Sequence, residues 1–261
     1  MSQRMDLLTP ALRGAANIAT TASPQRPTLL IAGAGGRLGS EVLAQALGEE
    51  RAARVQALVH EDITSSMRGF VPVLFSTLPG AMPSGPLHAV SAVIVFERAR
   101  HSNRRDEVFV MPDPAQLLAL ATTLRHSGVS RLMVVVPHAP ALLPSSLRGG
   151  FASHDEAAVA ALGFEHVLFL RSAQAASSSN TRHGALQRFA SWWLSQLSWM
   201  VPQSQQPVRV VRLAALVVEL LRLQLAAPAG TRVMPPEVLS QAAQAASSES
   251  LLRDWLQQGP G

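Results

Sequence analysis

Cysteine, lysine and tyrosine are all absent from this sequence of 261 residues. Without cysteine, the chain can form no disulfide, no thiolate nucleophile and no cysteine-ligated metal site. Without lysine, all 22 basic residues are arginine, and the sequence pI of about 11.3 largely reflects that arginine content.

Long hydrophobic runs are also missing. No apolar run reaches the roughly 18 to 20 residues that cross a bilayer, and charged residues such as Arg212 and Glu219 interrupt the best candidate, Val208 to Leu225. Residues 1–27 lack the continuous apolar core of a secretory signal and are interpreted as an N-terminal extension. The sequence therefore predicts a soluble, cytoplasmic protein without a membrane partner.

The formal charge of +5 is spread along the chain. The one arginine cluster comprises Arg98, Arg100, Arg104 and Arg105. Nucleic-acid binding usually needs a concentrated basic face, often with aromatic platforms, so no nucleic-acid partner is predicted. The histidines show no metal-ligand spacing, and no metal site is predicted.

Short apolar runs alternate with helical segments along the first two thirds of the chain. Helix-capping signals stand between them, including Asp113 with Pro114, Ser153 with Glu156, and the glycines Gly128 and Gly163. The strands expected from these runs cover residues 28–32, 55–59, 71–75, 92–96, 131–136 and 166–170, with the first helix at 38–47. This alternation predicts an α/β fold with a doubly wound parallel sheet.

The rhythm changes after about Ser172. We expect a helix at 184–200, another from Leu213, and short helices near Glu237 and Leu251. The predicted division is an extension at 1–27, a sheet domain at 28–175 and a small, mostly helical C-terminal lid or subdomain at 176–261.

A glycine-rich turn follows the first expected strand directly and precedes the first expected helix. It reads Gly33-Ala34-Gly35-Gly36-Arg37-Leu38-Gly39. Glycines there permit a tight turn, a close backbone approach to a pyrophosphate and close helix packing, while the helix N-terminus offers free N–H groups. In the first βα turn of an alternating chain, this pattern indicates a Rossmann dinucleotide-binding domain with all seven residues as cofactor-binding candidates.

The choice between NAD and NADP rests on conflicting signals. His60, Glu61 and Asp62 follow the second strand, where an acidic group accepts from a ribose 2′-hydroxyl and favours NAD. Arg37 can pair with the 2′-phosphate of NADP, and NADP is the cofactor that we prefer. His60 and Phe96, at the end of the fourth expected strand, complete the predicted cofactor-binding set.

The chain resembles the atypical short-chain dehydrogenase/reductases, in particular the NmrA-like and Tat-interacting-protein-like branch. The resemblance lies in TLLIAGAGGRLGSEVL, VSRLMVVV and AALGFEHVLFLRSA and covers about residues 28–220. It implies a Rossmann fold and an NAD(P) cofactor.

Catalytic members of that family carry a serine after the fifth strand and a Tyr-x-x-x-Lys motif on the next helix. Here Pro137 and His138 stand in place of the serine, and the best match to the motif runs from Phe151 to Asp155. Because the chain contains no tyrosine and no lysine, the usual dehydrogenase mechanism is excluded. His138 and His154 are alternative acid–base candidates. The favoured interpretation is that both are ordinary polar residues, one in a loop and one at a helix N-terminus.

Two further segments admit a functional reading. The charged stretch Glu97 to Glu107 follows the fourth strand, where it can hold an anion or form a solvated loop. The aromatic residues Trp192 and Trp193 lie on one expected helix, which packs in the core or forms a partner or homodimer surface.

The leading hypothesis is a non-catalytic NAD(P)-binding, redox-responsive regulatory module. The alternatives are an NAD(P)-dependent oxidoreductase or isomerase with a histidine acid–base, and a scaffold that binds no nucleotide.

Overall fold

The computed structural model of the chain describes residues 28–49, 54–63, 67–75, 87–97, 107–138, 154–173, 208–245 and 247–258. The N-terminal extension, the segment Phe151 to Ser153 and the predicted Trp192/Trp193 helix lie outside these ranges, as do the four clustered arginines.

Within the described ranges, seven strands form one sheet in the order β3-β2-β1-β4-β5-β6-β7, with every neighbouring pair parallel. The strands are β1 (Thr28–Ala32), β2 (Arg54–Val59), β3 (Phe70–Leu74), β4 (Ser91–Val95), β5 (Arg131–His138), β6 (His166–Ala173) and β7 (Gly230–Met234). The first six match the predicted runs, with ends displaced by up to a few residues. β7 was not predicted.

The helices in the described part of the chain are α2 (Arg37–Gly48), α4 (Leu117–His126), α5 (His154–Ala160), α7 (Val210–Leu223), α8 (Pro236–Gln244) and α9 (Ser248–Gln257). The short 3-10 turns η1 (Pro114–Gln116) and η5 (Gln224–Ala226) also lie there. The predicted cap at Asp113 is confirmed, because its carboxylate accepts the Ala115 N–H at 2.9 Å.

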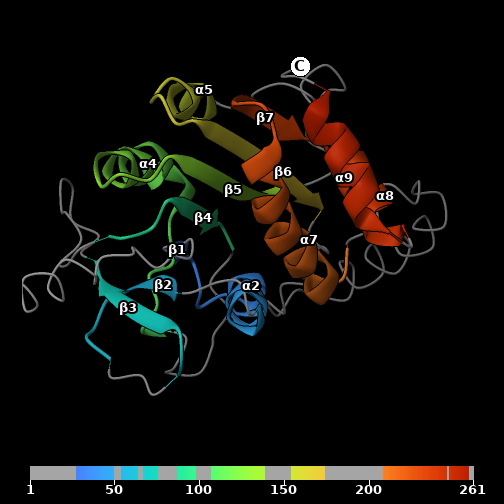
Figure 1. Cartoon of the computed structure of the whole chain (residues 1–261). Coiled ribbons are helices and arrows are strands. Elements are labelled where there is room, and N and C mark those ends of the chain that lie inside the picture. The colour runs from blue at the N-terminus through green and yellow to red at the C-terminus, as the bar shows by residue number, and fades with distance from the viewer. Residues whose placement is uncertain are drawn as a thin grey trace, which may run out of the picture.

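Helices cover both faces of the sheet, which confirms the doubly wound architecture (Figure 1). Successive residues of a buried strand point to opposite faces, so Leu29 and Ile31 of β1 join one apolar cluster while Leu30 and Ala32 join the other. The first cluster is completed by α2, α7, α8 and α9, and the second by α4 and α5.

The C-terminal part of the chain adds to this same architecture. β7 pairs with β6 at the edge of the sheet, and α7 packs beside α2. Residues 176–207 lie outside the described ranges, so a separate C-terminal lid remains a prediction.

Candidate functional site

The glycine turn connects the carboxyl end of β1 to the first turn of α2. Gly33 has φ +93°, a backbone conformation that strains any residue with a Cβ. A Cβ there would also overlap the carbonyl oxygen of Val95 at the end of β4. Glycine is therefore required at this position by both conformation and space.

Gly39 is the third residue of α2 and lets the first turn of the helix pack against the backbone of Gly33 and Ala34. A Cβ on Gly39 would overlap the Gly33 carbonyl group and approach Ala34. Because the obstacles are backbone atoms, they cannot rotate out of the way. This is the close helix-on-strand packing that the spacing of the glycines predicts.

Glu97, just beyond the end of β4, reaches the head of α2. Its Oε2 accepts the backbone N–H of Leu38 at 2.8 Å, and a Cβ on Gly36 would overlap its carboxylate. Gly36 is the N-cap of α2 and supplies no capping side chain of its own. A carboxylate is favourable at a helix N-terminus, since it accepts a free N–H and meets the positive end of the helix dipole. The N-terminus of α2 therefore already binds a carboxylate of the same chain, that of Glu97.

The carboxyl ends of β1 and β4 lie side by side, and the sheet order reverses between them. Ligands of open α/β sheets bind in the crevice at such a switch point. The segment Val108–Val110 crosses the neighbouring ends of β1 and β2. Gly33 N–H donates to Val110 O at 3.0 Å, Val110 N–H to Leu58 O at 3.0 Å, and His60 N–H to Val108 O at 2.8 Å.

The structure places the predicted cofactor-binding residues in different surroundings. Ala34, Leu38 and Gly39 are buried, Gly35 is partly buried, and the Arg37 side chain is exposed at the first position of α2. His60, Glu61 and Asp62 are exposed beyond the end of β2. The Phe96 side chain is 3% exposed and belongs to the apolar cluster beneath α4.

The two histidine candidates come from different elements. His138 is the last residue of β5, and only its backbone is described; His154 is exposed at the start of α5, as is the neighbouring Asp155. Among the residues that the structure describes, no group of three or more His, Asp or Glu side chains is arranged to hold a metal ion.

A buried ion pair joins β6 to α5. Arg171 Nη2 donates to Glu156 Oε2 at 2.9 Å, with side chains 2% and 5% exposed. From the sequence alone, Glu156 is predicted to help cap a helix, and no role is predicted for Arg171. No local pattern pairs the two, since the contact depends on how α5 packs across β6.

A second polar group lies at the amino ends of β5 and β6. His166 is 3% exposed, and its Nε2 lies 3.6 Å from the Glu165 carboxylate. Burial lowers the pKa of His166 below its usual 6.5; Glu165 opposes this effect, whereas Arg131 and Arg232 reinforce it. These groups lie at the end of the sheet opposite the glycine turn.

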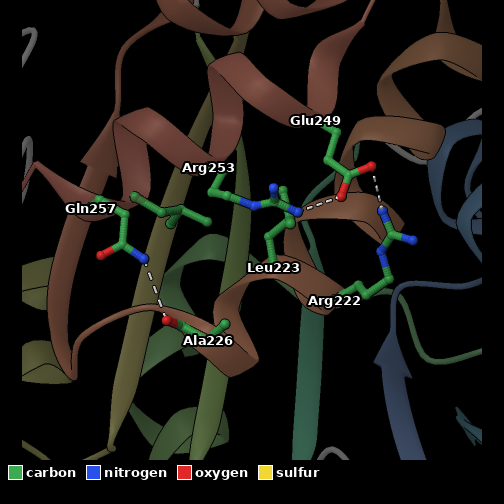
Figure 2. Close-up of a pocket in the computed structure, with 7 residues that line it drawn as sticks. Arg222, Leu223, Ala226, Glu249, Arg253 and Gln257 are labelled. Atoms are coloured by element: carbon green, nitrogen blue, oxygen red, sulfur yellow. Dashed lines mark hydrogen bonds and ion pairs between the residues drawn. The ribbon is translucent and has the colours of Figure 1, made fainter.

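A cavity of about 300 Å³ lies between α7, η5 and α9. Figure 2 shows Glu249 between two arginines. Its Oε2 lies 3.3 Å from Arg222 Nη2, and its Oε1 lies 2.6 Å from Arg253 Nη2. The cavity lies near the chain that leads into the start of β7, whereas the glycine turn follows the carboxyl end of β1. It is therefore not part of the crevice.

The strand order and the glycine turn settle the architecture. The chain has the Rossmann fold. Among the described residues, no helix is long and apolar enough to cross a membrane.

No protein-family model matches the chain, and no curated protein matches it in sequence. Solved structures do match. The WbmG enzyme of Bordetella bronchiseptica in complex with NAD is 14% identical, with 90% of this chain and 79% of that chain covered and a TM-score of 0.45. The UDP-Glc/GlcNAc 4-epimerase of Campylobacter jejuni is 9% identical (89% and 100% covered, TM-score 0.45). The oxidoreductase ylbE of Lactococcus lactis is 11% identical (88% and 97% covered, TM-score 0.43).

The backbone of the glycine turn is suited to a dinucleotide, whereas the Glu97 side chain that contacts it is not. Gly33 and Gly39 let α2 pack closely on the end of β1, which leaves the helix N-terminus where a diphosphate binds in a Rossmann turn. The Glu97 carboxylate, however, already accepts the Leu38 N–H. In this conformation the turn fits one carboxylate and not a diphosphate beside it.

Proposed function

We propose that this protein is a nucleotide-responsive binding module that takes a nicotinamide dinucleotide at the glycine turn and does not carry out tyrosine-dependent hydride transfer. The observation that supports it best is the geometry of Gly33 and Gly39, which hold α2 against the end of β1 beside the switch point. Backbone N–H groups at the N-terminus of a helix held in this way can donate to the phosphates of a dinucleotide. The resemblance to atypical short-chain dehydrogenase/reductases supports the same ligand class.

The missing side chains support a binding role over catalysis. The usual acid of the family is a tyrosine whose pKa is lowered by a lysine, and the chain has neither residue. At the start of α5, the exposed Asp155 stands where the family's lysine is expected. A carboxylate there repels the cofactor phosphates that a lysine would attract.

Within this proposal, NADP is the preferred form. The exposed Arg37 at the first position of α2 can pair with a 2′-phosphate through its planar guanidinium. Communication of occupancy through the Trp192/Trp193 helix, to a partner or a second copy, belongs to the same proposal, as does a cytoplasmic location.

Calorimetric titration of the full chain with NADPH and with NADH tests the proposal. We expect binding of both, with NADPH about tenfold tighter, and we expect Arg37→Ala to remove that preference without affecting NADH. The same samples are followed for oxidation of the reduced cofactor. Binding without oxidation supports the module.

Two outcomes would contradict it. Sustained oxidation that is lost in His138→Ala or in His154→Ala would make the protein a histidine-dependent oxidoreductase or isomerase. Absence of binding by wild type and by Glu97→Ala, which removes the carboxylate from the turn, would make it a scaffold.

A further inference from the structure

We infer that Glu97 is a built-in competitor for the dinucleotide, so that the free protein keeps its own phosphate-binding turn occupied. This inference rests on the proposed function for its ligand. It adds that ligand binding and release of the Glu97 carboxylate from α2 are one event.

The contact that carries the inference is the hydrogen bond from Leu38 N–H to Glu97 Oε2, at 2.8 Å. Leu38 is the second residue of α2, so its N–H has no partner within the helix. Phosphate oxygens at a Rossmann turn use the same free N–H groups. Two anions placed there would repel each other and compete for one donor, so the carboxylate must leave before a diphosphate can enter.

The identity of residue 36 argues that this contact is more than an ordinary helix cap. Helices are usually capped by Ser, Thr, Asp or Asn at the N-cap itself. Here the N-cap is Gly36, and the carboxylate belongs to Glu97, which lies 59 residues beyond Leu38 in the chain. A Cβ on Gly36 would overlap that carboxylate. Glycine thus opens the space that Glu97 enters and that a diphosphate would need.

The same connection between β4 and α4 covers a second part of the crevice. Its segment Val108–Val110 is held by backbone hydrogen bonds to Gly33, Leu58 and His60. A ribose bound between the glycine turn and the end of β2 would meet this segment. Glu97 and Val108–Val110 therefore cover the diphosphate and ribose positions together.

Competition of this kind lowers the apparent affinity by the fraction of molecules in which the turn is free. Removing one charge-assisted hydrogen bond should change that fraction roughly ten- to hundredfold. We expect Glu97→Ala to bind NADPH, and inorganic pyrophosphate as a minimal probe, more tightly than wild type by that factor. Glu97→Gln should lie between them, because an amide oxygen still accepts but carries no charge.

Glu41→Ala is the matched control. It removes a carboxylate from the same helix, where Glu41 accepts from Gln45 at 3.0 Å and makes no hydrogen bond with the turn among the described residues. Its affinity for NADPH should stay within about twofold of wild type. Circular dichroism confirms that each variant is folded, and Glu97→Gln serves if Glu97→Ala is not.

The outcomes separate the inference from the proposed function. Equal affinities of wild type, Glu97→Ala and Glu97→Gln for NADPH would overturn the inference and leave the binding module standing. No binding by any of them would overturn both. If Glu97→Ala and Glu97→Gln bind NADPH more tightly than wild type and Glu41→Ala do, the result supports both the inference and the proposed function.

A double-mutant cycle checks the position of Glu97 without any ligand. In wild type, Gly36→Ala should push the carboxylate away and destabilise the protein; in Glu97→Ala the same change should cost less. Coupling of the two effects on urea midpoints is expected, because residues in contact are not additive. Strict additivity would mean that Glu97 does not rest on Gly36, which would overturn the inference.

Discussion

Gly39 and Gly48 belong to the same helix but have opposite surroundings. A Cβ on Gly39 would overlap the Gly33 carbonyl, whereas a Cβ on Gly48 meets nothing within 4 Å. Gly39→Ala forces α2 away from the turn, so we expect a loss of about 3 kcal/mol in the free energy of unfolding. Urea denaturation followed by circular dichroism measures it.

Gly48→Ala is the matched control for that substitution. Gly48 does not have a positive φ, and alanine restricts the unfolded chain more than glycine does. We therefore expect no loss and a gain of up to about 1 kcal/mol. A Gly39→Ala protein as stable as wild type would show that α2 does not rest on the turn in solution.

At the level of single residues, the sequence predicts the glycines and misses the side chain among them. Gly33, Gly36 and Gly39 follow a pattern with a local physical reason, so their roles are readable in advance. Glu97 lies far away in sequence, and its contact with Leu38 arises only when β4 is placed beside β1. Its position directly after a strand next to the switch point was the one available signal.

At the level of elements, β6 and α5 are joined by the buried pair of Arg171 and Glu156. Removing one member of a buried ion pair typically costs about 3–5 kcal/mol, because the remaining buried charge loses an oppositely charged neighbour. We expect Glu156→Leu and Arg171→Met each to destabilise the protein by roughly that amount, measured by urea denaturation.

The double variant Arg171→Met/Glu156→Leu distinguishes the charge from the packing. Because both members of the pair are removed together, the double variant should lose less stability than the sum of the two single variants, since charges in contact are energetically coupled. If the double variant loses the sum of the two single effects, the pair is not energetically coupled.

Apolar runs made six strands predictable, but β7 has no such run. Its sequence GTRVM contains Arg232, which is buried and donates to Pro228 O at 2.9 Å. Strand formation there depends on pairing with β6, because β-propensity is strongly set by neighbours. The hydrogen bonds between Val108–Val110 and the ends of β1 and β2 join segments far apart in the sequence, so no local sequence pattern predicts them.

At the level of the whole molecule, distant segments complete each apolar cluster. Val42 and Ala46 of α2 share one cluster with Leu216 of α7 and Leu252 of α9. The helices α7, α8 and α9 thus cover the same face of the sheet as α2. We therefore expect a change in the charge of a buried group such as His166 to alter the free energy of unfolding of the whole protein.

The buried His166 makes that global stability depend on pH. Burial lowers its pKa in the folded protein below the 6.5 of an unfolded chain, with Arg131 and Arg232 acting in the same direction and Glu165 against it. Above the unfolded pKa, both states carry neutral imidazole and the group contributes nothing. Below it, the unfolded state binds the proton first, so stability falls as pH falls.

We expect wild-type stability to drop between about pH 7 and pH 5, and His166→Gln to lose part of that drop, as measured by urea midpoints across the range. Slopes are compared and not absolute stabilities, because the substitution also alters packing. His88→Gln, at an exposed position before β4, controls for the loss of a histidine elsewhere. If His166→Gln and wild type keep parallel pH profiles, the folded imidazole accepts protons as readily as the unfolded one, and the amino ends of β5 and β6 are open to water in solution.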